Sequence, residues 1–327
     1  MTDDTKVTVY VTVLNERDNI ALLLDSLLTQ TRKPDEILVI DGGSTDGTTG
    51  VVRKYIWEGN PIRLIESPGS NVAVGRNIGI ENASHDIVAS TDAGCRVERD
   101  WLDNLLDKFS DDVDIVSGVY LPDARTTFEE CVGELHFPDV DRLPDDWYFP
   151  SHRSVAFRKK VWETIGPIPE RLYRSEDSWF DLEAKRRGFR FKIAKDARVY
   201  WRPRKNLKEV YRNFHLWTKS DIENGVRADR AKHIARVRLL RVLWRVLGLS
   251  ALLFCGVYLS WFSAVILAPF IFKEMVQMYL KDRSLKKTVY KNLINLAECV
   301  GSIAGYLSAS WELRKTGNES SDRNRIV

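Results

Sequence analysis

The chain has 327 residues, and its 49 Lys and Arg against 46 Asp and Glu give a net charge of +3. A balance this close argues against nucleic-acid binding through bulk charge, so we expect no nucleic-acid partner. The four cysteines lie far apart without a CxxC pair, which argues against a zinc knuckle or a disulfide framework and fits a reducing compartment.

Short apolar runs alternate with helical patterns from the amino terminus to about residue 120. The expected strands are Val7–Leu14, Ile37–Ile40, Ile87–Ser90 and Ile115–Val119. Ile20–Leu28 carries apolar residues at helical spacing, and Trp101–Phe109 is amphipathic. This alternation is typical of an α/β fold, in which parallel strands are joined by crossover helices.

The next part of the chain is less regular. Residues 121–150 hold several Pro and Asp among scattered aromatics, a composition that predicts a long functional loop. Val155–Ile165 predicts a helix, and Ser175–Gly188 predicts a second one with Ser175 as its N-cap. Phe189–Tyr200 predicts a further strand.

An apolar segment without any charged residue, Val246–Phe272, follows a basic stretch. As a helix it is long enough to cross the ~30 Å hydrocarbon core of a bilayer. One tilted helix, a hairpin turning near Tyr258–Ser263, a re-entrant or interfacial helix and a buried helix of a soluble domain all remain open. Basic residues on both flanks favour the hairpin. Leu293–Trp311 is a weaker apolar stretch that lies on the membrane or adds a span, and the polar tail after Arg314 is expected to be disordered.

Polar side chains follow the predicted strands where these end. They are Asn15, Glu16, Asp41 and Asp92. In parallel sheets ligands bind beyond the carboxyl ends of the strands, so we expect these groups to line one site. Asp41 is placed to accept a hydrogen bond from the edge of a nucleotide base. The simpler interpretation is that Asp41 only begins a turn, because Asp-Gly-Gly is also good turn chemistry.

Four motifs in this order resemble inverting family 2 glycosyltransferases over roughly residues 5–220. They are VTVLNE, ILVIDGGSTDGT, SNVAVGRNIGIENASHDIVASTDAG and SEDSW. The resemblance implies a GT-A fold, which is Rossmann-like with a mostly parallel central sheet, and C-terminal hydrophobic helices attached to the membrane. The expected domains are a catalytic domain at 1–225, basic and membrane helices at 226–315 and a polar tail at 316–327. The implied activity is transfer of a sugar from a nucleotide-sugar donor, with inversion at the anomeric carbon.

The resemblance also assigns donor-binding residues. Asp41 matches the aspartate that contacts the base, and Asn15 and Glu16 line the same pocket. Arg76 lies in the segment packed near the nucleotide, where its fork of donors suits a phosphate. The simpler interpretations are a solvated acid at a helix start for Glu16 and a surface salt bridge for Arg76.

Asp92 stands at the family's DxD motif, whose two acids hold a divalent cation against the donor diphosphate. Gly94 occupies the place of the second acid. The resemblance still implies Mg²⁺ or Mn²⁺ at Asp92, completed by phosphate oxygens and water. The departure at Gly94 weakens this assignment of a metal.

Glu176 and Asp177 match the family's acidic pair at a helix start. An inverting transfer needs a base for the acceptor proton, and Asp177 matches that base with Glu176 as its neighbour. The simpler interpretation is that both acids only complement the helix dipole. His152, Arg153 and Ser154 follow the aromatic loop and are expected to face the acceptor.

The expected acceptor is a hydroxyl or phosphate on a lipid-linked compound or a glycan. The first residues are polar and carry no signal peptide, so we expect a catalytic domain on the cytoplasmic face of the cell membrane. Two alternatives are a nucleotidyltransferase, which lacks its Gly-rich loop here, and a non-catalytic scaffold, which Gly94 suggests. A polymer-forming synthase would need more spans and a Gln-x-x-Arg-Trp motif that is absent.

Overall fold

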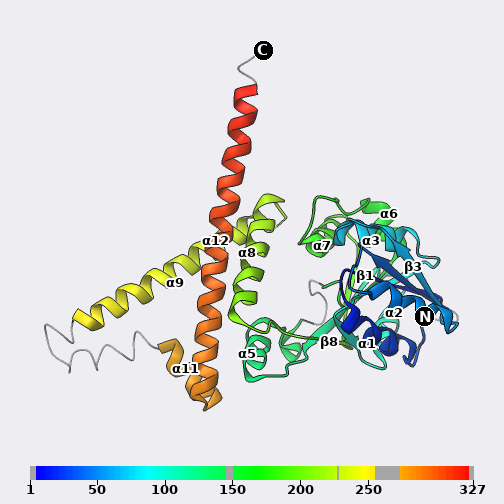
Figure 1. Ribbon diagram of the computed structural model, residues 1–327, viewed down its shortest axis with the longest axis horizontal. Coiled ribbons are helices and arrows are strands. Elements are labelled where there is room, and N and C mark those ends of the chain that lie inside the picture. Colours follow the sequence, from blue (N-terminus) through cyan, green and yellow to red (C-terminus); the bar gives the residue numbers. More distant parts are fainter. Residues whose placement is uncertain (1–4, 145–149, 227, 255–272, 324–327) are drawn as a thin grey trace. The chain divides into compact units, whose positions relative to one another are not determined.

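The computed structural model describes residues 5–144, 150–226, 228–254 and 273–323 (Figure 1). Two compact units divide the chain, and each is described by itself. The first contains residues 1–123 and 136–202, and the second contains residues 124–135 and 203–327. The expected division at residues 225 and 315 stays a prediction.

An eight-stranded sheet forms the centre of the first unit, in the order β3-β2-β1-β4-β7-β6-β8-β5. The strands are β1 Val7–Val13, β2 Glu36–Asp41, β3 Ile62–Glu66, β4 Ile87–Asp92, β5 Cys95–Val97, β6 Ile115–Pro122, β7 Val155–Arg158 and β8 Phe191–Trp201. The pairs β1–β2, β2–β3, β1–β4 and β6–β8 are parallel, whereas β4–β7, β6–β7 and β5–β8 are antiparallel. The sheet is therefore mixed, and the expected parallel arrangement holds for its first half.

Helices pack on this sheet because they bury an apolar stripe against it. They are α1 Arg17–Leu28, α2 Thr48–Trp57, α3 Val72–Glu81, α4 Trp101–Leu106, α6 Lys159–Ile165 and α7 Glu176–Arg186. In α1 the buried residues are Ile20, Leu23, Leu24 and Leu27, at helical spacing. The strand β2 is buried at every position, as expected for a strand covered on both faces.

Two glycines let α3 lie very close to the sheet. A Cβ atom at Gly79 would lie 2.8 Å from Tyr10 Cδ2, and one at Gly75 would lie 3.0 Å from Thr12 Cγ2. The helix begins at Asn71, whose side chain accepts hydrogen bonds from the backbone N–H groups of residues 73 and 74. This close packing fixes Arg76, which lies between the two glycines in sequence.

The sequence-based expectations differ from the structure in several elements. Residues 155–158 form β7 instead of the start of a helix, because they pair with β4 and β6. The expected loop at 121–150 contains the helix α5 Thr127–His136 and a short 3-10 helix at Val140–Arg142. The edge strand β3 was missed, since its burial pattern is weak and irregular.

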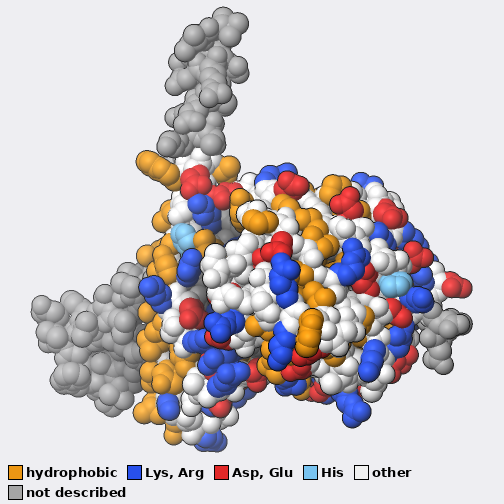
Figure 2. Space-filling model, turned by 45° about the vertical axis from the view of Figure 1, so that its right-hand side comes forward, with side chains coloured by type: hydrophobic (Ala, Val, Ile, Leu, Met, Phe, Trp, Pro, Cys, Tyr) orange, Lys and Arg blue, Asp and Glu red, His pale blue; other side chains and the backbone are white. Residues whose placement is uncertain are grey.

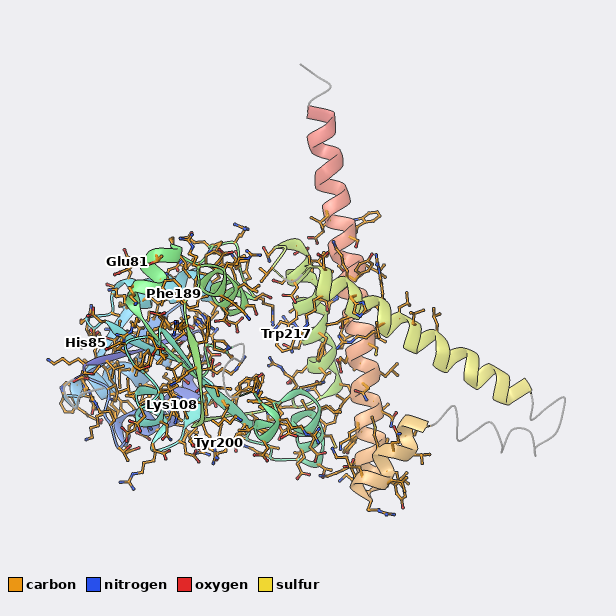
Figure 3. The ribbon with its side chains drawn as sticks, turned by 180° about the vertical axis from the view of Figure 1, so that it is seen from behind. Glu81, His85, Lys108, Phe189, Tyr200 and Trp217 are labelled. Carbon is orange, nitrogen blue, oxygen red and sulfur yellow. The ribbon has the colours of Figure 1, made fainter. Side chains whose placement is uncertain are left out.

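The second unit is helical. Its elements are α5 as far as residue 135, α8 Leu207–Glu223, α9 Ala228–Phe254, α11 Lys273–Asp282 and α12 Leu285–Arg323. The helices α8 and α12 lie side by side, and Trp217 marks α8 in Figure 3. Gly305 and Gly301 make this possible, since a Cβ at either position would lie within 2.5 Å of an α8 carbonyl oxygen. Lys291 is buried and pairs with Asp282 at 2.6 Å.

The predicted membrane segment Val246–Phe272 lies partly outside the described residues, since 255–272 are not among them. Among the described residues, no helix is both long enough and apolar enough to cross a membrane. All of Leu293–Trp311 lies in α12, which packs against α8. The same helix continues to Arg323, beyond Arg314 where a disordered tail was expected, because an established helix can propagate through polar residues.

Figure 2 shows basic and acidic side chains mixed over the face in view, in keeping with the balanced net charge. Hydrophobic side chains are also exposed on the second unit. On α12 they include Leu285, Val289, Leu293, Leu296, Val300, Leu307 and Trp311. Their spacing of three or four residues, with one gap of seven, places them on one side of the helix.

Candidate functional site

The carboxyl end of β2 carries Asp41, a buried acid with one occupied and one open oxygen. Its Oδ2 accepts hydrogen bonds from the backbone N–H groups of Gly43 and Ser44, each at 2.9 Å. Its Oδ1 has no hydrogen-bond partner among the described residues, although it is buried. A buried acceptor without a partner calls for an explanation, and a ligand donor is one. The turn interpretation of Asp41 therefore accounts for Oδ2 and leaves Oδ1 without a role in the turn.

Asn15 and Glu16 join the end of β1 to the turn after β2. Asn15 has a φ of 55°, a left-handed conformation that Asn tolerates better than most residues. Its Oδ1 accepts from the Thr45 backbone N–H at 2.9 Å. The Glu16 backbone N–H donates to Thr48 Oγ1, and Glu16 Oε2 accepts from Asn19 Nδ2 at 2.7 Å. Both residues therefore shape the rim of the Asp41 turn.

A buried arginine lies between two acids. Arg76 Nη2 is 3.0 Å from Glu176 Oε1 and 3.5 Å from Asp92 Oδ1. Arg76 and Glu176 are both buried, whereas Asp92 is about a quarter exposed. Burial lowers the pKa of Arg76, but the two carboxylates outweigh it and hold the guanidinium charged. The structure thus brings together Arg76, Asp92 and Glu176 from α3, β4 and α7.

The helix α7 begins at this cluster. Ser175 is its N-cap residue, as expected, but it has a φ of 63° and makes no side-chain capping bond. Asp177 is partly exposed in the first turn, and its Oδ1 accepts from the backbone N–H of Ser178 at 2.7 Å. An accessible carboxylate beside a buried acid and arginine has the chemistry of a general base.

Arg153 joins the cluster from the other side, a role that the sequence did not reveal. Its Nε is 3.5 Å from Asp92 Oδ2, and its guanidinium lies 4.3 Å from the ring centre of Trp201. The sequence suggested an acceptor-facing position for Arg153 together with its neighbours. Its contact with Trp201 joins residues far apart in the chain, and no local signal announces it.

His152 and Ser154 are both in the core, which differs from the expected acceptor-facing surface. His152 is fully buried, with its Nδ1 3.0 Å from Tyr10 Oη. Ser154 Oγ accepts from Trp101 Nε1 at 2.9 Å and donates to the Ala197 carbonyl at 3.2 Å. They lie on either side of Arg153 in sequence, so they fix the backbone that presents it.

The residues present do not fit a cation site of the two-carboxylate kind. Gly94 offers no ligand, and the two oxygens of Asp92 face the guanidinium groups of Arg76 and Arg153. Within the described ranges, no group of three or more His, Cys, Asp or Glu side chains is arranged to hold a metal ion.

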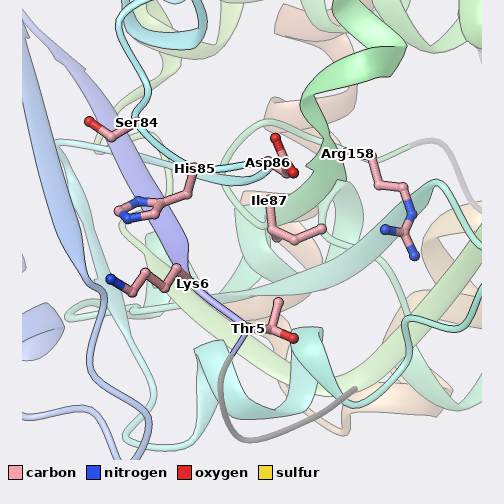
Figure 4. A pocket seen from close by; sticks show the side chains of 7 residues that line it. All are labelled: Thr5, Lys6, Ser84, His85, Asp86, Ile87 and Arg158. Atoms are coloured by element: carbon pink, nitrogen blue, oxygen red, sulfur yellow. The ribbon is translucent and has the colours of Figure 1, made fainter.

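A pocket elsewhere on the sheet is lined by none of the candidate site residues. It lies at the amino ends of β1 and β4 and is lined by Thr5, Lys6, Ser84, His85, Asp86, Ile87 and Arg158 (Figure 4). His85 Nδ1 lies 2.9 Å from Thr8 Oγ1 on β1. The candidate site is at the opposite ends of these strands, at Asp92 and beyond Val13.

The buried Glu176 predicts a specific dependence of stability on pH. Burial raises its pKa from 4.5 to about 7, with Arg76 opposing and Asp177 adding to the shift. The folded chain therefore holds this proton more tightly than the unfolded chain, and the resulting stability is lost as pH rises towards 7. We expect the unfolding free energy to fall between pH 4.5 and 7, by at most about 1.4 kcal/mol per pH unit from this group. Denaturant unfolding at several pH values measures this fall. In Glu176→Gln the unfolding free energy should depend less on pH, and an unchanged pH dependence would contradict the assignment.

The residues of this site lie in a part of the chain that is similar to known proteins. A protein-family model described as glycosyl transferase family 2 matches residues 8–197. Glycosyltransferase GlyA of Streptococcus pneumoniae serotype 4 is 30% identical over 162 residues, which cover 49% of this chain and 22% of GlyA. Glycosyltransferase AglE of Haloferax volcanii is 29% identical over 206 residues, which cover 58% of this chain and 65% of AglE. The matches thus span less than two thirds of these relatives.

A solved structure shares the fold. The mannosyltransferase PcManGT from Pyrobaculum calidifontis, determined in complex with GDP-Man and Mn²⁺, superposes with a TM-score of 0.66 at 20% identity. The alignment covers 95% of this chain and 89% of that one. The expected GT-A-like α/β fold is confirmed by this likeness.

Proposed function

We propose, from the premise that this chain belongs to glycosyl transferase family 2, that it transfers a sugar from a nucleotide-sugar donor to an acceptor with inversion. The observation that carries the proposal is the cluster in which Arg76 contacts both Asp92 and Glu176, with Asp177 next to Glu176 in sequence. These groups come from three different elements of the sheet unit, and they meet at the end of β4.

The donor's nucleoside lies at the turn after β2. The unpartnered Oδ1 of Asp41 accepts a hydrogen bond from the base, while its other oxygen is held by two backbone N–H groups. Because these bonds exist before the ligand arrives, the open oxygen is already oriented. Asn15 and Glu16 border this pocket through their bonds to the same turn.

The chemical step is an in-line displacement. Asp177 takes the proton of the acceptor hydroxyl as its oxygen attacks the anomeric carbon. The bond from that carbon to the diphosphate oxygen breaks on the opposite face, and the electron pair leaves with the nucleoside diphosphate. Arg76 lies where this negative charge develops, and positive groups placed there lower the barrier. Where a two-carboxylate cation site has two acids, the described residues provide Asp92 alone, so this chain's own positive group at the leaving diphosphate is Arg76.

The acceptor in this proposal is lipid-linked, and the chain works at the cytoplasmic face of a membrane. The uncharged sequence Val246–Phe272 and the apolar side chains exposed along α12 support this part. Basic residues flank the segment, in keeping with attraction to anionic headgroups. Fractionation of cells that express the chain tests the location, and recovery in the cytosolic fraction alone would contradict it.

A donor screen tests the proposed reaction. Purified chain is incubated with UDP-, GDP- and dTDP-sugars, with or without a membrane lipid extract, and nucleotide release is followed. We expect release with one donor class that rises when the extract is present. Parallel samples contain Mg²⁺, Mn²⁺ or a chelator, which tests the cation that the family resemblance implies. Donor binding without any release would instead favour the scaffold alternative, and a nucleotidyltransferase would release pyrophosphate from a nucleoside triphosphate.

A further inference from the structure

On the two arginines that contact Asp92, three buried guanidinium nitrogens have no hydrogen-bond acceptor in the part of the chain that the structure describes. They are Nε and Nη1 of Arg76 and Nε of Arg153. Arg76 is only 4% exposed. A buried donor without an acceptor costs free energy, and proteins keep such groups mainly where a ligand completes them.

Aromatic side chains hold Arg153 in its place. Its guanidinium lies 4.3 Å from the ring centre of Trp201 and 5.6 Å from that of Tyr120. Its Nη1 donates to Ser151 Oγ at 2.8 Å, and Phe137 stacks on Trp201. An arginine fixed in this way loses little side-chain entropy when an anion binds, so its contribution to affinity is large.

Asp92 alone does not account for two arginines. Both ion pairs are 3.5 Å long, which is longer than a charge-assisted hydrogen bond. Arg76 is already paired more closely with Glu176 at 3.0 Å. The two guanidinium groups therefore retain donor capacity beside Asp92, and the planar guanidinium fork matches the oxygens of phosphate groups.

We propose that Arg153 and Arg76 form the binding site for the diphosphate of the donor. Gly94 stands where the second acid of the DxD motif would help to hold a cation, and Arg153 supplies positive charge in place of that cation. This inference rests on the proposed function and deepens it. Both guanidinium groups contact the phosphate oxygens in the bound donor. When the anomeric carbon–oxygen bond breaks, the electron pair remains on the leaving diphosphate, whose added charge they stabilise.

Calorimetry on the full chain tests the proposal with GDP, UDP and dTDP as probes and with guanosine, uridine and thymidine as their phosphate-free counterparts. We expect Arg153→Gln to weaken binding of the preferred nucleoside diphosphate about 10- to 100-fold, because one charge-assisted contact is lost. Nucleoside affinity should change less than about 2-fold. Arg153→Lys should recover part of the loss, since it restores the charge without the fork or the stacking.

Arg96 offers a matched control. Its guanidinium also lies 4.3 Å from an aromatic ring centre, that of Tyr200, which Figure 3 labels. Among the described residues the ion pairs of Asp92 are with Arg76 and Arg153, not with Arg96, so Arg96→Gln should leave both affinities unchanged. Equal losses for Arg96→Gln and Arg153→Gln, or equal losses for nucleoside and nucleotide, would overturn the inference.

The outcomes separate this inference from the proposed function. If the unaltered chain binds GDP, UDP or dTDP and both Arg153 variants bind it equally well, only the role of Arg153 is wrong. If the unaltered chain binds none of the three nucleotides, the proposed function fails and this inference fails with it. Should Arg153→Gln not fold, as judged by its thermal transition, Arg153→Lys carries the comparison, and full affinity in that variant would count against the fork.

Discussion

Replacing Asp177 by Asn should lower kcat by about 10²- to 10⁴-fold, the range expected for loss of a general base. Asp177 is partly exposed in the first turn of α7, and its Oδ1 accepts from the Ser178 backbone N–H. Asn has the same shape and keeps that acceptor, so the helix start should survive. It cannot take up the acceptor proton. Steady-state transfer with the donor identified by the screen gives kcat, and calorimetry with the same nucleotide should show unchanged affinity.

A control for this experiment lies on the same helix. Glu183 pairs with Arg186 at the surface, 2.6 Å away, and Glu183→Gln removes the same charge without touching the cluster. It should retain transfer close to that of the unaltered chain. Full activity in Asp177→Asn would exclude Asp177 as the base. A loss of donor binding equal to the loss of activity would assign it to donor binding instead.

Replacing Arg76 by Met should cost about 3–5 kcal/mol of stability as well as donor binding. Arg76 is buried between Glu176 and Asp92, so the change leaves buried acids without their cation. The penalty should be smaller at pH 5 than at pH 8, because Glu176 can take up a proton and become neutral. Denaturant unfolding at the two pH values measures both effects.

The matched control is an exposed ion pair. Arg190 and Asp112 lie 2.8 Å apart, and both side chains are more than half exposed. Arg190→Met should cost less than about 1 kcal/mol at either pH. If Arg76→Met lowers the unfolding free energy no more than Arg190→Met does, the buried ion pairs of Arg76 contribute no more stability than an exposed pair. A large loss without pH dependence would mean that Glu176 does not titrate as described.

The positions of side chains that follow a strand or begin a helix could be predicted from the sequence. Asp41, Asp92 and Glu176 could be placed because an apolar run fixes where a strand ends and because acids collect at helix starts. The fold followed from the same alternation for β1, β2 and β4. All three strands are buried on both faces, and β2 accordingly contains a continuous apolar run, while β1 and β4 also include Thr or Ser.

What could not be predicted depends on contacts between distant residues. The strand β7 is short, and only its pairing with two neighbours distinguishes it from the helix that follows. The burial of His152 depends on Tyr10, which is far away in the chain. Arg153 acquires its place from Trp201 in the same way. Local periodicity contains no information on such pairs, so a basic and a polar residue after an aromatic loop were expected at the surface.

The close contact of α3 with β1 limits which substitutions the site can tolerate. Gly75 and Gly79 leave no room for another atom between helix and sheet, so the backbone that presents Arg76 has a single available depth. Efforts to evolve this protein towards a different sugar should therefore leave these two glycines untouched, since a larger side chain at either position would push the helix, and Arg76 with it, away from the sheet.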